Sequence, residues 1–319
     1  MKETVCSKGI RVLALAAALL PGGCRDRSEV TVFCAASLHP VLSDTAARFA
    51  REQRDHTVSL QPSGSLVAAR KLVELGMRAD LVAVADADII DRILAPGHAT
   101  WNLLPVANEM VIAHRDHSPF TDRISTENWH ELLLREEVRL GCTDPDTAPL
   151  GYRTLFAWQL FGQLANAPGL ADRLRARCAR EHVVPDENEL GKLLQAQAID
   201  YAFLYRSTAD SHHLKVTALP PEANLSRPEL FDRYQAASVE IRLSGNEKAT
   251  VRGKPIVYGL TIPNNARNRR GAVAFTAFLL GKQGRRAFER AGFRPLAPAP
   301  CRRCDRLPQP LRPLVAKSP

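Results

Sequence analysis

One loop of this sequence, Thr143–Arg153, has residue types and spacing suited to holding a small anion. It reads Thr-Asp-Pro-Asp-Thr-Ala-Pro-Leu-Gly-Tyr-Arg, and it follows a strand-like run at residues 138–141. Apolar side chains then recur at helical spacing over residues 155–164, so a helix is expected to begin within the loop. Pro149 suits the first turn, which needs no N–H donor there, and the N–H groups of residues 150–152 are predicted to be free.

The start of this helix has two possible roles. Free N–H groups and the positive end of the helix dipole together attract anions such as phosphate or sulfate. An ordinary capped helix start has the same spacing, so the loop alone leaves both interpretations open.

Strand-like and helical segments alternate in the first part of the chain. Residues 30–36, 58–60 and 79–84 are apolar and strand-like, and helical patterns separate them. This alternation predicts parallel βαβ units, in which small ligands bind beyond the carboxyl ends of the strands. The polar residues expected at those ends are Ser37, Ser63, Ser65 and Asp86. Ser37 and Ser65 are equally suited to capping helices, and capping does not prevent ligand binding.

A series of short motifs extends this pattern from Val30 to Pro298. Taken together and in order, they resemble the extracytoplasmic molybdate/tungstate-binding proteins that serve ABC transporters, especially their archaeal-type branch. The resemblance rests on residues 35–38, 64–66, 79–81, 85–86, 108–113, 144–145, 149–154, 199–203, 205–207 and 255–263.

The resemblance implies an α/β fold of the second periplasmic-binding-protein type, with two lobes that close on a tetrahedral anion. Ser37 and Ser65 would donate hydroxyl and backbone hydrogen bonds, and a backbone donor near Glu187 would complete the cage with Tyr205. The site residues that it implies are Ala36, Ser37, Ser65, Ala148, Pro149, Leu150, Gly151, Glu187, Leu204 and Tyr205.

The sequence departs from the archaeal-type pattern at two positions. That branch has an Asp directly before the Pro-x-Gly-Tyr-Arg segment and a Glu directly before Tyr-Arg-Ser, and both acids ligate the metal. Here the two positions hold Ala148 and Leu204, which cannot ligate a metal. We therefore expect a four-coordinate oxyanion held by neutral hydrogen-bond donors, with no metal ligated by the protein and no cofactor.

The expected lobes are discontinuous in sequence. Lobe 1 is predicted from residues 28–107 plus 262–300, and lobe 2 from residues 108–261. Two long strands, at residues 108–114 and 255–262, are expected to form the hinge between them.

The first residues read as an export signal. Basic residues precede an apolar run at 12–20, which is too short to span a bilayer stably, and Pro-Gly-Gly-Cys follows. Residues 1–23 are therefore interpreted as a signal peptide of lipoprotein type, with Cys24 as the lipidated residue. A simply secreted or uncleaved leader remains the alternative. The mature protein is expected to be periplasmic or extracytoplasmic, and to meet the membrane only through a lipid anchor.

The net charge of +9 is concentrated outside the predicted lobes. Residues 1–23 carry +2 and residues 301–319 carry +4, which leaves +3 for the body. Without interleaved basic and aromatic residues, this charge argues against nucleic-acid binding. The tail at 301–319 is basic and Pro-rich, so it is expected to be disordered.

The remaining cysteines suggest no zinc site. Cys301 and Cys304 lack a second ligand pair nearby, which leaves a disulfide in an oxidising compartment or no bond at all. Cys34 and Cys142 lie in apolar strands and are expected to fill the core.

The sequence supports three candidate functions to different degrees. An enzyme is disfavoured because the histidines are scattered and no Ser-His-Asp or Cys-His pairing can be assembled. The favoured function is capture of molybdate or tungstate for an ABC transporter permease by a monomeric binding protein. The alternative is a binding protein or sensor for another anion, such as sulfate, phosphate or a small organic anion, since both family acids are missing.

Overall fold

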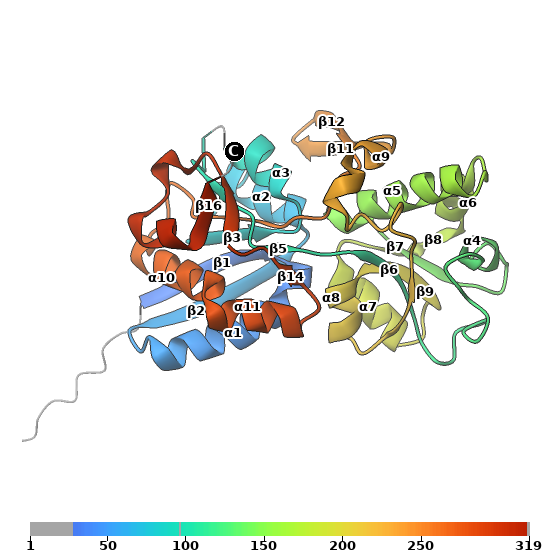
Figure 1. Ribbon diagram of the computed structural model, residues 1–319, viewed down its shortest axis with the longest axis horizontal. Coiled ribbons are helices and arrows are strands. Elements are labelled where there is room, and N and C mark those ends of the chain that lie inside the picture. The colour runs from blue at the N-terminus through green and yellow to red at the C-terminus, as the bar shows by residue number, and fades with distance from the viewer. Residues whose placement is uncertain (1–27, 96, 318–319) are drawn as a thin grey trace, which may run out of the picture.

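The computed structural model describes residues 28–95 and 97–317, which form two α/β lobes side by side (Figure 1). This confirms the predicted bilobal α/β fold. The predicted leader and its Cys24 lie outside the described residues. Among the described residues, no helix is both long and apolar enough to cross a membrane.

Lobe 1 is built on a seven-stranded sheet in the order β16-β15-β4-β13-β3-β1-β2. β1 pairs in parallel with β2 and β3, which confirms the predicted βαβ units. β1 carries a run of buried side chains because helices cover both faces of such a sheet. On one side Phe49 of α1 packs against Phe275 and Phe278 of α10, with ring centroids 5.2 and 5.7 Å apart. The strands are β1 Ser28–Ala35, β2 His56–Ser63, β3 Leu81–Val84, β4 Asn102–Leu103, β13 Gly259–Thr261, β15 Ala299–Arg302 and β16 Val315–Lys317.

Lobe 2 is built on a five-stranded sheet in the order β10-β6-β9-β7-β8. β7 pairs in parallel with β8 and β9, whereas β6 runs antiparallel to β9 and β10. Trp158 of α5 packs edge-on against Phe203 of β9, so the predicted helix after residue 148 seals the core of this lobe. The strands are β6 Met110–His114, β7 Leu140–Thr143, β8 Cys178–Val184, β9 Tyr201–Tyr205 and β10 Lys215–Ala218.

Two extended segments join the lobes. They meet at residues 106–108 and 256–258, where Ala107 bridges Val257 and the Tyr258 N–H donates to the Val106 carbonyl at 3.0 Å. The strand β5 (Val106–Ala107) also pairs with β14 (Arg294–Pro295). The crossing is therefore shorter than the predicted hinge strands, because β6 already belongs to the sheet of lobe 2 and β13 to that of lobe 1.

The helices fill the space around these sheets. Lobe 1 has η1 Ala36–Leu38, α1 His39–Glu52, α2 Ser65–Val73, α3 Ala87–Ile89, η2 Ile90–Leu94, α10 Arg269–Leu280, α11 Lys282–Arg290, η4 Cys304–Arg306 and η5 Gln309–Leu314. Lobe 2 has α4 Trp129–Leu132, α5 Pro149–Leu164, α6 Leu170–Arg177, α7 Glu187–Gln195, α8 Arg206–Ser211, η3 Pro228–Leu230 and α9 Phe231–Tyr234.

A hairpin of β11 (Ser238–Ser244) and β12 (Glu247–Arg252) reaches from lobe 2 towards lobe 1 (Figure 1). Arg70 of α2 meets it there. Its guanidinium donates to the Leu243 carbonyl at 2.7 Å and to the Asp146 carbonyl at 2.8 Å. One side chain of lobe 1 thus holds two segments of lobe 2.

The prediction of a disordered tail is wrong for residues 301–317. β15 pairs with β4 and β16 with β15, so the tail extends the sheet of lobe 1. Leu307 and Leu311 are buried, and Arg302 donates to Asp88 and Asp91 at 2.8 and 2.6 Å. Composition suggested disorder, but these two leucines and the acidic partners supply the contacts that a disordered tail lacks.

The cysteines follow the predictions in part. Cys34 is a free, fully buried core residue as expected. Cys301 and Cys304 form a disulfide, which was one of the two alternatives. Cys142 packs against the core but is only partly buried, and the prediction missed its bond to Cys178 on the neighbouring strand, whose Cα atom lies 6.0 Å away.

Candidate functional site

The predicted lobe 1 residues lie at the carboxyl ends of adjacent strands. Ser37 lies in η1 directly after β1, Ser65 is the first residue of α2 after β2, and both are buried. Neither side chain caps a helix. The Ser65 hydroxyl accepts from the Ala85 N–H at 2.9 Å, and the Ser37 hydroxyl lies 3.1 Å from the Tyr258 hydroxyl. The capping interpretation is therefore wrong for both, and each instead links its strand to a neighbouring segment.

The lobe 2 loop begins α5 as predicted. Ala148 is the extended residue before the helix, Pro149 is in the first turn, and residues 148–154 are buried. One detail differs from the prediction. The Gly151 N–H is not free, because the tight first turn lets it donate to the Ala148 carbonyl at 3.1 Å. Gly151 must also lack a side chain, since a Cβ would lie 2.6 Å from the Thr143 carbonyl oxygen.

The two lobes touch directly around these residues. The Leu66 N–H donates across the interface to the Thr147 carbonyl at 3.2 Å. The Asn188 side chain donates to the Ala36 carbonyl at 2.9 Å. The Ser37 N–H donates to the Glu187 carboxylate at 2.8 Å, and both residues are buried. The structure is thus a closed arrangement of the lobes.

The side chain of Glu187 makes a contact that the sequence did not predict. The resemblance implied a backbone donor near this residue, but the structure shows its side chain as an acceptor of the Ser37 N–H. The pKa of Glu187 is raised, chiefly because burial disfavours the carboxylate, although hydrogen bonding to Ser37 partly opposes this. The difference arises because Glu187 opens α7 at the lobe interface, where its side chain faces η1 of the other lobe.

A buried charged network lies beside these residues. Arg153 of α5 donates to the Tyr205 hydroxyl at 2.8 Å and to the Ala85 carbonyl at 2.7 Å. Its other terminal nitrogen, Nη2, has no hydrogen-bond partner and lies 3.6 Å from the Asp86 carboxylate. Arg153 therefore brings a cation from lobe 2 to the strand ends of lobe 1.

Asp86 is the acid of this network. It accepts from the Tyr152 hydroxyl at 2.7 Å and pairs with Lys254 at 2.7 Å. Burial by itself would raise its pKa, but Lys254 and then Arg153 favour the carboxylate and hold the pKa below its usual value. Asp86 is thus an ionised group whose charge is balanced locally.

Not every predicted residue joins this assembly. Tyr205 does, through Arg153, whereas Leu204 is a fully buried member of the apolar core, since neighbouring residues in a strand face opposite sides. Sequence reasoning missed Arg153 and Tyr258 as site residues. The available signal for Arg153 was its place in the Pro-x-Gly-Tyr-Arg segment, at the start of an apolar helix. Arginine is rarely buried without a partner, so an arginine at such a place indicates a buried charged network.

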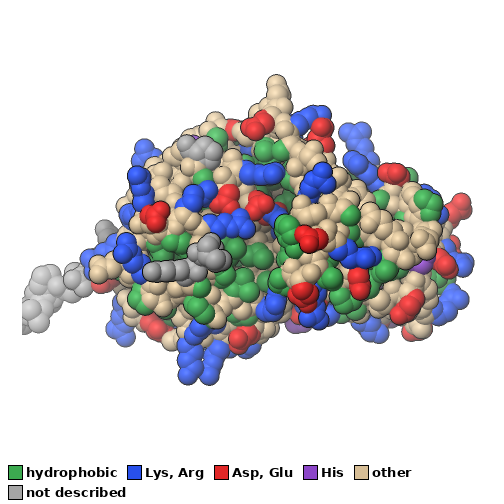
Figure 2. Space-filling view, turned by 45° about the horizontal axis from the view of Figure 1, so that its top comes forward, with side chains coloured by type: hydrophobic (Ala, Val, Ile, Leu, Met, Phe, Trp, Pro, Cys, Tyr) green, Lys and Arg blue, Asp and Glu red, His purple; other side chains and the backbone are tan. Residues whose placement is uncertain are grey.

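The described residues offer no metal centre. Within residues 28–95 and 97–317, no group of three or more His, Cys, Asp or Glu side chains is placed to hold a metal ion. Charge is also not gathered in one patch: on the face seen in Figure 2, basic and acidic side chains are interspersed over both lobes.

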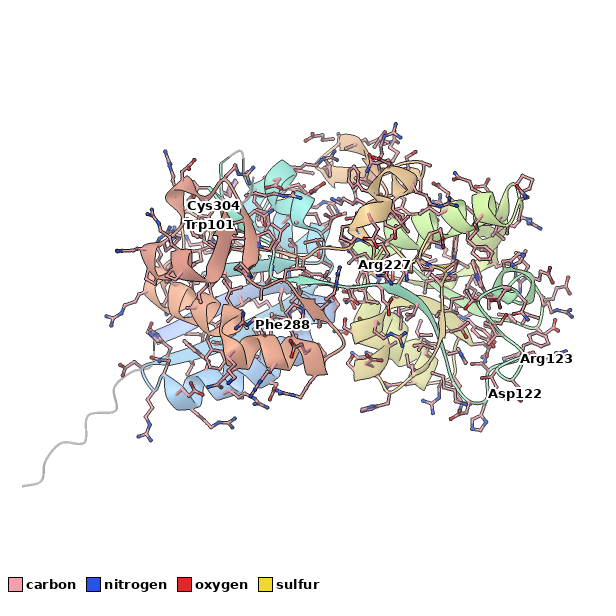
Figure 3. The ribbon with its side chains drawn as sticks, viewed as in Figure 1. Trp101, Asp122, Arg123, Arg227, Phe288 and Cys304 are labelled. Atoms are coloured by element: carbon pink, nitrogen blue, oxygen red, sulfur yellow. A yellow bond between two sulfur atoms is a disulfide. The ribbon has the colours of Figure 1, made fainter. Side chains whose placement is uncertain are left out.

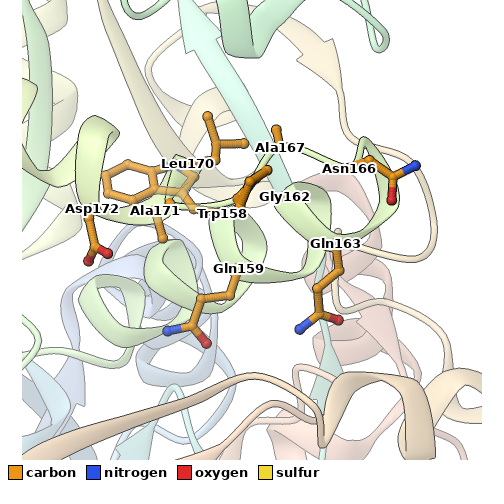
Figure 4. Close-up of a pocket in the computed structure, with 11 residues that line it drawn as sticks. Trp158, Gln159, Gly162, Gln163, Asn166, Ala167, Leu170, Ala171 and Asp172 are labelled. Atoms are coloured by element: carbon orange, nitrogen blue, oxygen red, sulfur yellow. The ribbon is translucent and has the colours of Figure 1, made fainter.

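Three cavities in the described part of the chain differ in size and in their distance from this assembly. A cavity of about 30 Å³ between the lobes is lined by Asp86, Tyr152 and Lys254 among others, so closure leaves little free volume there. A larger groove of about 520 Å³ runs along α5 and α6, and Trp158, Gln159 and Asp172 are among the residues that line it (Figure 4). A third, of about 440 Å³, is at the hinge, where Figure 3 shows Arg227 between the lobes. None of these three cavities is lined by a predicted site residue, although Leu66 and Tyr152 of the smallest one are their sequence neighbours.

Comparisons with known proteins agree with this architecture. The sequence profile of a family described as bacterial extracellular solute-binding protein matches residues 30–294. A molybdate/tungstate-binding protein WtpA from Pyrococcus abyssi is 31% identical over 88% of this chain and 91% of its own. The WtpA protein of Thermococcus kodakarensis is 34% identical over 72% of this chain and 70% of its own.

Solved structures show the same fold at low identity. The periplasmic molybdate-binding protein of Azotobacter vinelandii matches with a TM-score of 0.58 and 17% identity, over 83% of this chain and 98% of that one. The sulfate-binding protein SubI of Mycobacterium tuberculosis matches with a TM-score of 0.62 and 16% identity, over 85% of this chain and 88% of that one.

Proposed function

This chain belongs to the bacterial extracellular solute-binding proteins, and from that premise we propose that it captures molybdate or tungstate and delivers it to an ABC transporter permease. Proteins of this family bind solutes outside the cytoplasm for transport. Relatives at 31% and 34% identity bear the name molybdate/tungstate-binding protein, which supports this choice of oxyanion. We keep lipidation of Cys24 as part of the proposal, as the link that would hold the protein at the membrane.

The observation that carries the proposal is the meeting of buried polar groups from both lobes. Ser37 and Ser65 come from the strand ends of lobe 1, and from lobe 2 Glu187 of α7 meets Ser37 while the segment before α5 meets the start of α2. The Leu66-to-Thr147 hydrogen bond shows how closely these segments approach. An anion held there would receive donors from both lobes, so its binding would favour closure.

The coordination of the oxyanion follows from the side chains at two positions. Ala148 and Leu204 supply no ligand oxygen, so the oxyanion would keep four oxygen neighbours and be held by hydrogen bonds. Hydrogen bonds to a charged group contribute about 1.5–3 kcal/mol each, so a few aimed donors suffice.

A calorimetric panel on the purified protein tests this proposal. We expect micromolar or tighter binding of both molybdate and tungstate, and clearly weaker binding of sulfate and phosphate. X-ray absorption of the tungstate complex is expected to show four oxygen neighbours rather than six. Heat from sulfate or phosphate, with none from molybdate or tungstate, would reject the oxyanion assignment.

A second function remains as the alternative outcome of the same panel. The loss of both acids at positions 148 and 204 also fits a binding protein or sensor for sulfate, phosphate or a small organic anion. The low-identity match to a sulfate-binding protein supports the shared fold only. Binding of such an anion in preference to molybdate and tungstate would establish this alternative.

A further inference from the structure

The carboxylate of Glu187 accepts a hydrogen bond from a backbone N–H group that the oxyanion is expected to use. The Ser37 N–H is one of the lobe 1 backbone donors that the family resemblance implies for the oxyanion, and it donates to Glu187 Oε1 at 2.8 Å. The two residues are 150 positions apart and belong to different lobes. A side-chain anion and a ligand anion therefore require the same N–H group.

The position of Glu187 is fixed by its neighbours. Next to it, Asn188 donates to the Ala36 carbonyl at 2.9 Å, which holds the start of α7 against η1. The carboxyl group is buried, so water cannot readily replace the Ser37 hydrogen bond if the carboxylate is displaced. The Ser37 N–H thus stabilises an ionised Glu187, and an oxyanion that took this N–H group would remove that stabilisation.

The groups facing Glu187 offer little compensation for a second negative charge. Cys34 of β1 and Tyr258 lie close enough for their pKa values to be raised by Glu187, though burial is the larger cause for both. Tyr205 of β9 is affected in the same direction. Asp186, the preceding residue, is a further acid that raises the pKa of Glu187. Arg153 is the nearby cation, and it is already engaged with Tyr205 and Asp86.

We propose that binding of a dianionic oxyanion at this site is coupled to the uptake of a proton by Glu187. The inference rests on the proposed function of the site. The proton comes from solvent and bonds to a carboxylate oxygen of Glu187, so the ionised protein, the dianion and one proton yield a complex with a neutral Glu187. The neutral carboxyl group no longer repels the ligand, and its O–H becomes an additional donor. Ser37 N–H is released to the oxyanion in the same step.

This coupling makes affinity depend on pH in a defined direction. Where Glu187 is ionised in the free protein, binding of a fully ionised oxyanion must take up a proton, and its affinity falls as pH rises. The limiting slope is about tenfold per pH unit. The raised pKa of Glu187 moves this dependence from the acid range towards neutral pH.

The test is calorimetry of tungstate binding over a neutral to alkaline range, in which tungstate stays a fully ionised monomer. Each titration is made in two buffers with different heats of ionisation, which counts the protons taken up. We expect the wild-type uptake to approach about one proton per tungstate as pH rises, with a parallel loss of affinity. This measurement needs no variant.

Two variants assign the proton to Glu187. In Glu187→Gln the amide oxygen can still accept from Ser37 and the amide group can donate to the ligand, so we expect little proton uptake and nearly constant affinity. Glu189→Gln, an exposed position two residues along the same helix, should keep the wild-type behaviour. Two results would overturn the coupling but not the proposed function. One is equal proton uptake in wild type and Glu187→Gln, and the other is tungstate binding by wild type without proton uptake. Absence of tungstate binding at every pH overturns the proposed function as well.

Discussion

The side chain that most clearly separates this site from an ordinary lobe interface is Arg153. It is fully buried, yet it makes no bidentate pair with an acid: Nη1 donates to both Tyr205 and Ala85, and Nη2 faces Asp86 at 3.6 Å. Removing a charge from water is costly, and a buried charge is tolerated only when its partners are held in place. Arg153 therefore stabilises the closed lobes only as part of its network.

Replacing Arg153 with Met tests this dependence. Met fills much of the same volume but removes one of the two cations beside Asp86 and leaves the Tyr205 hydroxyl and the Ala85 carbonyl without their buried donor, so we expect a loss of about 3–5 kcal/mol in the free energy of unfolding. Denaturant titration measures the loss. Arg48→Met is the control, because Arg48 pairs with Asp44 on an exposed helix face, where such pairs contribute only about 0–1 kcal/mol. Similar losses of unfolding free energy in the two variants would show that the buried Arg153 network stabilises the protein no more than an exposed ion pair does.

Single positions differ in how far the sequence predicts them. Ser37 and Ser65 could be placed because each follows a strand of a parallel sheet, and the ends of such strands converge. The orientation of Glu187 could not, because it depends on the meeting of two segments that are 150 residues apart. Local periodicity carries no information about which side of such a contact supplies the donor.

Among helices and strands, the alternating strand and helix pattern was enough to predict the parallel units of lobe 1 and the start of α5. The C-terminal segment was mispredicted because proline and arginine content describes average behaviour, whereas order here depends on two buried leucines and on Asp88 and Asp91. The Cys142–Cys178 bond was missed for a similar reason. It joins neighbouring strands, β7 and β8, whose pairing is irregular between Leu140 and Cys142, so spacing along the chain gave no sign of it.

The two disulfides are expected to contribute unequally to stability. Cys142 and Cys178 are separated by 36 positions, and Cys301 and Cys304 by three. Since closing a longer loop removes more entropy from the unfolded chain, the loop-entropy relation gives about 4 kcal/mol for the first bond and about 2 kcal/mol for the second.

Two paired replacements measure this difference. The Cys142→Ala, Cys178→Ala protein should unfold at clearly lower denaturant concentration than the Cys301→Ala, Cys304→Ala protein, with both compared to oxidised wild type. The wild type under reducing conditions serves as a control that removes both bonds without changing the sequence. An equal or larger loss in the tail variant would mean that packing around Cys301, rather than loop closure, dominates.

The protein as a whole is organised around the contact between its lobes. Arg70 of lobe 1 holds the hairpin and the Asp146 carbonyl of lobe 2, and Asn188 of lobe 2 holds η1. Next to the hinge crossing, Lys254 pairs with Asp86 of the charged network. A ligand of such a protein shifts the equilibrium between the open and closed arrangements only to the extent that it binds one of them more tightly than the other. Any change that raises the free energy of the closed arrangement should therefore weaken binding without touching a ligand contact.

Gly64 offers such a change, because it lies where lobe 1 meets lobe 2. A Cβ at this position would lie 2.3 Å from the Thr147 carbonyl oxygen and 3.2 Å from that of Pro185. Both are backbone atoms of lobe 2, which cannot move aside as a flexible side chain can. Its own backbone angles, φ −57° and ψ 141°, are allowed for alanine, so lobe 1 alone should accept the substitution.

We therefore expect Gly64→Ala to open the lobes while leaving each lobe folded. Small-angle scattering should give a larger radius of gyration than for wild type, and the affinity for the bound oxyanion should fall at least tenfold, or about 1.4 kcal/mol. Gly97→Ala is the matched control, since a Cβ there meets no heavy atom within 4 Å. The opposite result would be a Gly64→Ala protein as compact as wild type that binds the oxyanion with the same affinity. In that case neither closure of the lobes nor ligand binding would require the tight approach of Gly64 to Thr147.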